Sequence, residues 1–138
     1  MSTVKATRIF VVEDHAATAR GLKTYLETMG YSVETAGSCE SARALAERIE
    51  FDVLICDLNL PDGNGWDLAE FLQKKRPLRA IAFSAYNEPV HIERSERAGF
   101  VRHIVKGTAP ETLVEAIEEA IRHRPSGNHR AGLATACS

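Results

Sequence analysis

The sequence predicts an α/β domain built on a doubly wound, five-stranded parallel sheet with helices on both faces. Five short apolar segments alternate along the chain with five segments of helical periodicity, which is the pattern of repeated βαβ units. Three of the apolar segments are almost uninterrupted, as in strands that are buried on both faces. Right-handed crossovers leave few strand orders, and 2-1-3-4-5 is a common one for five strands.

The predicted strands are short and evenly distributed. Strands one, three and four are the nearly continuous apolar runs. In chain order the five segments are Arg8–Glu13, Tyr31–Ala36, Asp52–Cys56, Arg79–Phe83 and Val101–Val105.

The helices between them are indicated by apolar residues spaced i, i+3, i+4 and i+7. In two cases a capping signal precedes this spacing and marks where the helix begins. Thr108 with Glu111 predicts a capping box at the start of the last helix, and Asn64 with Asp67 a weaker one before the third. The apolar spacing is clearest in segments 22–29, 42–49 and 113–121.

The fourth helix, expected over about residues 89–98, differs from the others. Its candidate core residues are only Val90, Ile92 and Ala98, among many charged side chains. Because little apolar area would hold it against the sheet, we expect it to be the least firmly docked element.

Composition excludes several classes of protein. The chain has 19 acidic and 17 basic residues, a net charge of −2, which disfavours a dedicated nucleic-acid binder. No apolar run approaches the roughly 18 residues of a membrane span, and the N-terminus lacks the apolar core of a signal peptide. Three widely spaced cysteines suggest free thiols in a reducing compartment. We therefore expect a cytoplasmic protein without nucleic-acid or membrane partners.

The domain is expected to span residues 7–123. Residues 1–6 are predicted to be an N-terminal extension, and residues 124–138 lose all periodicity and contain Pro, Gly, Ser and Asn. That composition predicts a flexible C-terminal tail rather than an output domain.

Polar side chains gather where the predicted strands end. Glu13 and Asp14 end the first strand, Asp57 follows the third, Ser84 follows the fourth and Lys106 follows the fifth. Parallel strands place their carboxyl ends at one edge of the sheet, where ligands of open α/β sheets bind. Three carboxylates, a hydroxyl and an ammonium are thus expected to converge.

The charges of this group indicate its chemistry. Carboxylates about 4 Å apart repel by roughly 4 kcal/mol per pair at an effective dielectric constant near 20. A hard divalent cation offsets this repulsion, and an all-oxygen site suits Mg²⁺. A phosphoryl group would be bound by such a cation, Lys106 and Ser84, and a carboxylate can itself be the nucleophile that forms an acyl phosphate.

Four stretches carry a resemblance to a known family: VVEDH (11–15), DLNLPDGNGWDL (57–68), AFSAY (82–86) and HIVKG (103–107). Together they resemble the receiver domain of bacterial response regulators, the phosphoacceptor half of two-component signalling. The resemblance covers about residues 7–122, and within the family the chain is similar to the stand-alone, chemotaxis-regulator type. It implies a flavodoxin-like sheet and a signalling protein that catalyses only its own phosphorylation and dephosphorylation.

The resemblance also implies the roles of individual residues. Asp57 would accept the phosphoryl group from a sensor histidine kinase or a histidine phosphotransfer protein. Asp14 and Asp57 would ligate Mg²⁺ (or Mn²⁺) directly, together with the backbone carbonyl of Asn59, and Glu13 would act mostly through water.

Two further residues would contact the phosphoryl group. Lys106 would pair with its oxygens, and Ser84 would hydrogen-bond to it and pull the following loop inward. Ser84 and the residue three before the lysine form the family's conformational switch.

The chain departs from the family at two positions. The switch residue is His103 instead of Tyr or Phe, and Gly107 follows the lysine where the family has a proline in a cis linkage. A cis bond before glycine would cost about 3–4 kcal/mol, so either this bond is trans or its loop is strained. Imidazole could make the output weaker, or sensitive to pH near 6.5.

The expected function is that of a single-domain response regulator that binds an output protein when Asp57 is phosphorylated. The expected contact face comprises the fourth helix, fifth strand and fifth helix. A module that binds constitutively, and a phosphate sink in a phosphorelay, remain alternatives. A phosphohydrolase is disfavoured because Asn59, two residues after the acceptor, cannot supply a proton.

Overall fold

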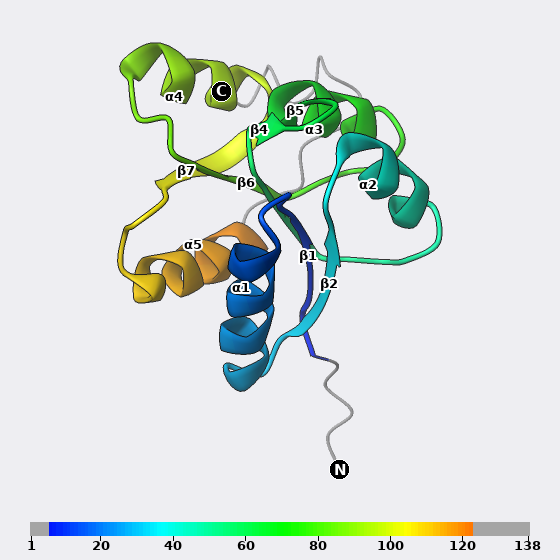
Figure 1. Ribbon diagram of the computed structural model, residues 1–138, viewed down its shortest axis with the longest axis vertical. Coiled ribbons are helices and arrows are strands. Elements are labelled where there is room, and N and C mark those ends of the chain that lie inside the picture. The colour runs from blue at the N-terminus through cyan, green and yellow to red at the C-terminus, as the bar shows by residue number, and fades with distance from the viewer. Residues whose placement is uncertain (1–5, 123–138) are drawn as a thin grey trace.

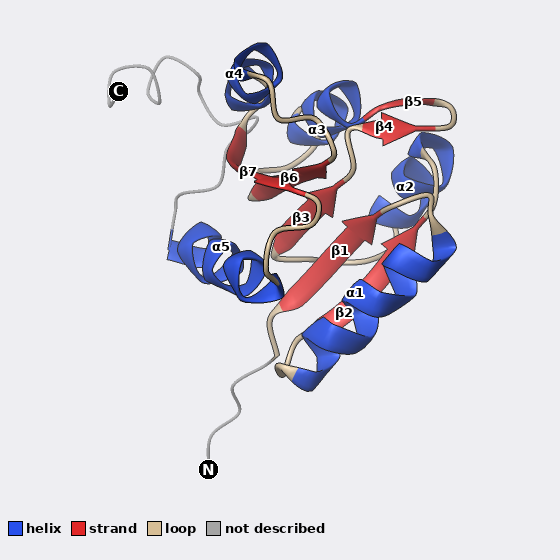
Figure 2. Ribbon diagram, turned by 60° about the vertical axis from the view of Figure 1, so that its left-hand side comes forward, coloured by secondary structure: helices blue, strands red, loops and turns tan. Residues whose placement is uncertain are grey.

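The computed structural model describes residues 6–122 and shows a three-layer α/β architecture (Figure 1). Five parallel strands form the central sheet in the order β2-β1-β3-β6-β7. Helices α1 and α5 cover one face, and α2, α3 and α4 cover the other (Figure 2). These five strands correspond to the five predicted from the sequence, with β6 and β7 as the predicted fourth and fifth strands. The predicted fold class and the strand order 2-1-3-4-5 are therefore confirmed.

The elements follow the predicted sequence, with one small hairpin added. In chain order they are β1 (Arg8–Val12), α1 (Ala16–Thr28), β2 (Ser32–Ala36), α2 (Cys39–Ala46), β3 (Val53–Cys56), β4 (Asn59–Leu60), β5 (Gly63–Asn64), α3 (Gly65–Gln73), β6 (Ala80–Ser84), α4 (Pro89–Arg97), β7 (Phe100–Val105) and α5 (Pro110–Arg122). The predicted tail, residues 124–138, lies outside the described residues, as does the N-terminal extension apart from Ala6.

Two apolar cores lie on the two faces of the sheet. Successive side chains of a strand point to opposite faces, so Phe10 packs toward α2 and α3 while Ile9 and Val11 pack toward α1 and α5. All of the residues of β3 are buried, as predicted for a strand covered on both sides. The sheet is therefore a rigid support for whatever follows the ends of its strands.

The hairpin formed by β4 and β5 is pinned to the start of α2. The two carboxylate oxygens of Asp62 accept hydrogen bonds from the backbone nitrogens of Cys39 (2.7 Å) and Glu40 (2.9 Å). These bonds lower the pKa of Asp62, and they satisfy two amides that a helix N-terminus leaves unpaired. The segment that follows the predicted acceptor is thus fixed to the rest of the domain.

One of the two predicted helix starts is confirmed. The side chain of Asn64 caps α3 by accepting from the backbone nitrogen of Asp67 at 2.8 Å. The capping box predicted for the last helix is wrong: the Thr108 hydroxyl donates to the Val105 carbonyl, and α5 begins later, at Pro110. Proline suits this first position because its ring fixes a helical φ and it has no N–H to satisfy.

Helix α4 has few apolar contacts, as predicted. Ser95 is the one buried residue among its nine, and Ala98 is buried just after the helix ends. The prediction that Val90 faces the core is wrong, because this residue is 61% exposed. How firmly α4 is docked stays a prediction.

Gly65 tests how closely α3 approaches the end of β3. A Cβ at this position would overlap the backbone carbonyl oxygen of Asp57 and lie 3.0 Å from the Cys56 sulfur. We expect Gly65→Ala to lower the free energy of unfolding by about 1–3 kcal/mol, the usual effect of overpacking. Gly21, inside α1, has open space around it, so Gly21→Ala should raise the same free energy by about 0.5–1 kcal/mol. Urea unfolding compares the two; equal effects would contradict the close approach.

Candidate functional site

The candidate site lies at the carboxyl edge of the sheet, where the register brings its residues together. Val12 on β1 pairs with Cys56 on β3, so Glu13 and Asp57 leave the sheet side by side. The Asp57 nitrogen donates to the Val12 carbonyl at 2.9 Å, which fixes the backbone at the start of the following loop. The local sequence therefore positions the acids through ordinary parallel pairing.

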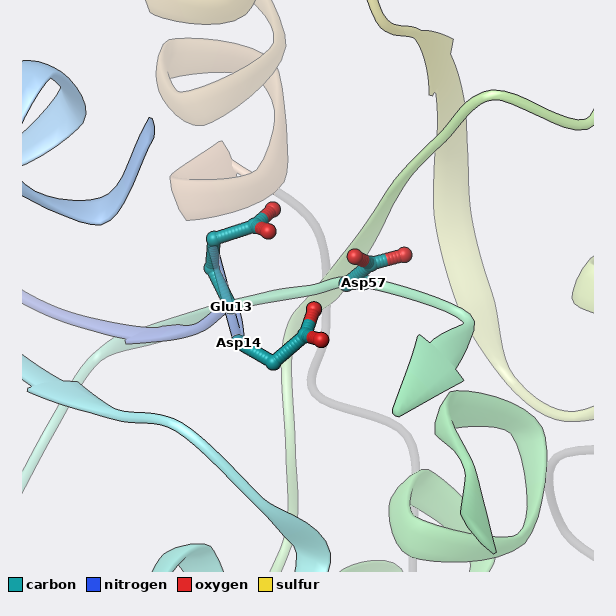
Figure 3. Close-up of side chains that lie close together, drawn as sticks. All are labelled: Glu13, Asp14 and Asp57. Carbon is teal, nitrogen blue, oxygen red and sulfur yellow. The ribbon is translucent and has the colours of Figure 1, made fainter. Parts of the chain in front are cut away.

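Three carboxylates share one small space. Glu13, Asp14 and Asp57 point toward one another (Figure 3), and each offers an oxygen within 4.8 Å of the other two. Glu13 and Asp57 are buried and Asp14 is exposed. The predicted convergence of the three acids is what the structure shows, with one side of the cluster open to solvent.

Lys106 lies between two of these acids. Its Nζ atom is 2.9 Å from Asp57 Oδ2 and 2.8 Å from Glu13 Oε1. Burial disfavours the charged ammonium and lowers its pKa, but the hydrogen bonds and charges of the two acids outweigh this effect. The pKa of Lys106 is raised as a result, so the side chain is a cation throughout the physiological range.

Glu13 keeps one oxygen with unused capacity. Its Oε2 atom accepts a hydrogen bond from the backbone nitrogen of His15 at 3.0 Å. Its Oε1 atom is buried and is paired with the Lys106 ammonium at 2.8 Å, and no other polar group among the described residues reaches it. A carboxylate oxygen has two lone pairs, so Oε1 keeps capacity to accept from a water bound to a cation.

The donor set fits a hard divalent cation. One ammonium faces three carboxylates, so the cluster keeps an excess of negative charge, and its donors are oxygens of the kind that Mg²⁺ prefers. Asn59 lies beside the cluster, because its backbone nitrogen donates to Asp57 Oδ1 at 3.1 Å. The acidic group could therefore hold a metal ion.

Ser84 stands at the end of β6 next to this cluster and is 1% exposed. Its backbone carbonyl accepts a hydrogen bond from the backbone nitrogen of Lys106 at 2.8 Å, so the sheet fixes the two residues relative to each other. Its hydroxyl oxygen accepts from the backbone nitrogen of Tyr86 at 3.1 Å. Ser84 is thus linked both to the lysine and to the loop that leads to α4.

His103 does not lie in the acidic cluster. Its Nδ1 atom is 2.9 Å from the Ser95 hydroxyl on α4, and its Nε2 atom is 2.7 Å from the backbone carbonyl of Tyr86. The pairing of β7 with β6 is irregular at Val101, which puts Phe100 and His103 on the same face of the sheet although they are three positions apart.

The peptide bond between Lys106 and Gly107 is trans, unlike the cis linkage that the family has before proline. There is no cis peptide bond among residues 6–122, so the bond from Lys106 is trans. The glycine has φ +95°, a left-handed conformation that proline, with φ near −65°, cannot adopt. The loop therefore takes a different path from the one that a proline would set.

Sequence reasoning missed two residues near the site. Trp66 and Ser95 hydrogen-bond to each other at 3.0 Å, and both are buried. Trp66 lies inside the recognised stretch 57–68, but nothing in its spacing pointed to a polar partner. Ser95 is one small polar residue in a polar helix, and only its burial distinguishes it.

Comparison with known proteins agrees with this geometry. The family model described as the response regulator receiver domain matches residues 9–118. The chain belongs to this family, whose members are phosphoacceptor signalling modules of two-component systems.

Among curated relatives, the alginate biosynthesis transcriptional regulatory protein AlgB of Pseudomonas aeruginosa is 31% identical, over 89% of this chain and 31% of that protein. The transcriptional regulatory protein PdtaR of Mycobacterium tuberculosis is 31% identical, over 83% of this chain and 56% of that protein. The chain thus spans between about a third and about half of the length of these relatives.

Solved structures give the same result for the fold. A CheY-like receiver domain protein of Methanospirillum hungatei is 32% identical with a TM-score of 0.80, over 85% of this chain and 94% of that one. The HemR receiver domain of Leptospira biflexa is 34% identical with a TM-score of 0.79, over 86% and 98%.

Within residues 6–122, each helix is too short or too polar to span a bilayer.

Lys106→Met tests how far the ammonium compensates the acids. Removing it leaves Glu13 and Asp57 buried beside each other, and we expect the free energy of unfolding at pH 7 to fall by about 2 kcal/mol or more. Arg97→Met, which breaks an exposed pair with Glu93, should cost less than about 1 kcal/mol.

The raised pKa sets the pH dependence of this loss. A group whose pKa is higher in the folded state contributes stability that is complete below its unfolded pKa and is lost as the pH rises through the folded one. The difference in the free energy of unfolding between wild type and Lys106→Met should therefore be constant from pH 7 to 9 and shrink above about pH 10.5. Urea unfolding across this range measures it; a difference that grows at high pH would contradict the assignment.

Proposed function

We propose that the protein is a Mg²⁺-dependent phosphoacceptor that takes a phosphoryl group onto Asp57 from the phosphohistidine of a sensor kinase or a histidine phosphotransfer protein. One observation carries the proposal: the Asp57 carboxylate is held by Lys106 at 2.9 Å inside a cluster of three acids, at the strand end where a receiver domain has its acceptor. Family membership supports phosphoacceptor chemistry in general, and the local geometry supports Asp57 as the acceptor.

The reaction transfers the phosphoryl group from nitrogen to oxygen. A carboxylate oxygen of Asp57 attacks phosphorus, a P–O bond forms, the P–N bond of the donor breaks, and the imidazole leaves with the electron pair and takes up a proton. The carboxylate is oriented for this attack, because Oδ2 accepts from Lys106 and Oδ1 accepts from the backbone of Asn59. Such positioning is the main contribution a protein makes to phosphoryl transfer.

Mg²⁺, or Mn²⁺, would bind to Asp14, Asp57 and the backbone carbonyl of Asn59, with Glu13 acting through water. When bound, the cation neutralises the acids and draws the phosphoryl oxygens toward them. The open acceptor capacity of Glu13 Oε1 and the exposed carboxylate of Asp14 support this assignment.

Two residues would bind the transferred group. The Lys106 ammonium is a mobile donor that can turn from the acids to the phosphoryl oxygens. The Ser84 hydroxyl accepts from Tyr86, which leaves its own hydrogen available to donate to a phosphoryl oxygen. Binding therefore draws Ser84, and with it the backbone at Tyr86, toward Asp57.

The output would be phosphorylation-dependent binding of a protein to the face made by α4, β7 and α5. Val90 on α4 (61% exposed) offers apolar contact area there. A tenfold change in partner affinity requires a differential stabilisation of only about 1.4 kcal/mol between the two conformations. The stand-alone organisation of the regulator, and action in the cytoplasm, stay predictions.

The acceptor is tested by the intact mass of the full chain after incubation with a small acyl phosphate and Mg²⁺. Wild type should gain one phosphoryl group, because the acceptor and its cation are both present, and the gain should disappear when Mg²⁺ is chelated. Asp57→Asn should gain none. Asp67→Asn, which changes an exposed aspartate at the start of α3, should behave as wild type.

Phosphorylation of Asp57→Asn to the wild-type level would show that another residue is the acceptor. A folded wild-type protein that gains nothing under any condition would contradict the phosphoacceptor proposal and favour the constitutive binding module.

A further inference from the structure

Helix α4 is held on the sheet mainly by polar and aromatic contacts. Ser95 is its buried residue, and Val90 is 61% exposed. The His91 ring stacks on Tyr86 with centroids 4.6 Å apart, and the Arg94 guanidinium lies over the Trp66 ring at 4.2 Å. Because hydrogen bonds depend on distance and direction more steeply than apolar contacts do, α4 is sensitive to small movements of its partners.

A continuous hydrogen-bonded chain passes through Ser95. The Trp66 indole nitrogen on α3 donates to the Ser95 hydroxyl at 3.0 Å. That hydroxyl is 2.9 Å from His103 Nδ1 on β7, and His103 Nε2 is 2.7 Å from the backbone carbonyl of Tyr86. The chain thus connects two helices, one strand and the loop that follows β6.

The chemistry of its two ends fixes the direction of every bond in this chain for a neutral imidazole. The indole nitrogen can only donate, and the Tyr86 carbonyl can only accept. His103 must therefore carry its proton on Nε2, which leaves Nδ1 to accept from the Ser95 hydroxyl. Each donor then has one acceptor, and the buried serine is fully satisfied on both sides.

The chain also reaches the acceptor site. The backbone nitrogen of Tyr86, whose carbonyl holds His103, donates to the Ser84 hydroxyl oxygen at 3.1 Å. Ser84 is the residue whose hydrogen is available to a phosphoryl group on Asp57. A displacement of Ser84 would therefore move the Tyr86 backbone, whose carbonyl oxygen pairs with the imidazole that contacts Ser95.

We propose that Ser95 is a positioning residue: with Trp66 and His103 it forms a latch that fixes α4, and this latch transmits the movement of Ser84 on phosphorylation to α4. The inference rests on the proposed phosphoacceptor function and on the family's switch pair, Ser84 with residue 103, and adds Ser95 and Trp66 as the residues that connect this pair to α4. It assigns to His103 a role that depends on its two ring nitrogens, which a Tyr or Phe at this position could not reproduce.

The first experiment tests the latch in the absence of any ligand, by hydrogen–deuterium exchange of the full chain. Trp66→Phe removes one hydrogen bond of the latch, and the α4 amides should then exchange about fivefold faster, as expected for one net hydrogen bond. Ser95→Ala removes two, and its α4 amides should exchange at least as fast as those of Trp66→Phe. Amides of α5 should not change. The matched control is Ser32→Ala, which alters an exposed serine on β2 and should leave α4 at the wild-type rate.

Nitrogen NMR of His103 provides a second readout without ligand. At about pH 8.5, where an imidazole side chain is ordinarily neutral, wild type should show the ring proton on Nε2, and Ser95→Ala should lose the hydrogen bond at Nδ1 while the fold is retained. Unchanged α4 exchange in both Ser95→Ala and Trp66→Phe, or a ring protonated at Nδ1 alone, would overturn the latch whatever the outcome of phosphorylation.

The second experiment tests transmission with beryllofluoride and Mg²⁺, which imitate the phosphoryl group on Asp57. Wild type should show a changed exchange rate in α4, and Ser95→Ala should lose most of this change while it still gains one phosphoryl group from a small acyl phosphate. A full wild-type response in Ser95→Ala would overturn the transmission step. If wild type gains no phosphoryl group, the proposed function fails and the transmission step with it, while the latch itself is judged by the ligand-free experiment.

Discussion

Repulsion among the carboxylates of Glu13, Asp14 and Asp57 is the constraint on which the site depends. The sheet forces these acids together, because the paired ends of β1 and β3 release Glu13 and Asp57 at adjacent points. One ammonium, that of Lys106, is held against two of them. The remaining negative charge favours a divalent cation at this edge and supports the proposal that Asp57 accepts a phosphoryl group.

The rest of the fold divides into a rigid part and a responsive part. Strands β1, β3 and β6 are almost wholly buried between two apolar cores, so the positions of the acids and of Ser84 are set by packing. Helix α4 has little apolar contact and depends on Ser95, Trp66 and His103. In the proposed latch, a local change at Asp57 would reach α4 without disturbing the sheet.

The sequence was sufficient for the sheet and for the acidic cluster, because strand runs are strongly apolar and parallel strands end at one edge. It was insufficient where few residues decide the geometry. The hairpin of β4 and β5 is too short to show a period, and the irregularity at Val101 reverses the faces that simple alternation assigns to β7. Val90 satisfied a helical spacing, but α4 turns another side to the sheet. The partners of Ser95 come from distant segments, which local patterns do not report.

The central claim is tested most directly by the free energy of unfolding of wild type and Asp14→Asn, measured with urea with and without Mg²⁺. Asp14 is exposed, so the substitution changes charge with little effect on packing. Without Mg²⁺ the variant should be the more stable of the two, because repulsion is relieved. Mg²⁺ at about ten times its dissociation constant should stabilise wild type by about 1.4 kcal/mol and the variant much less. Equal stabilisation of both proteins, or none of wild type, would contradict the account.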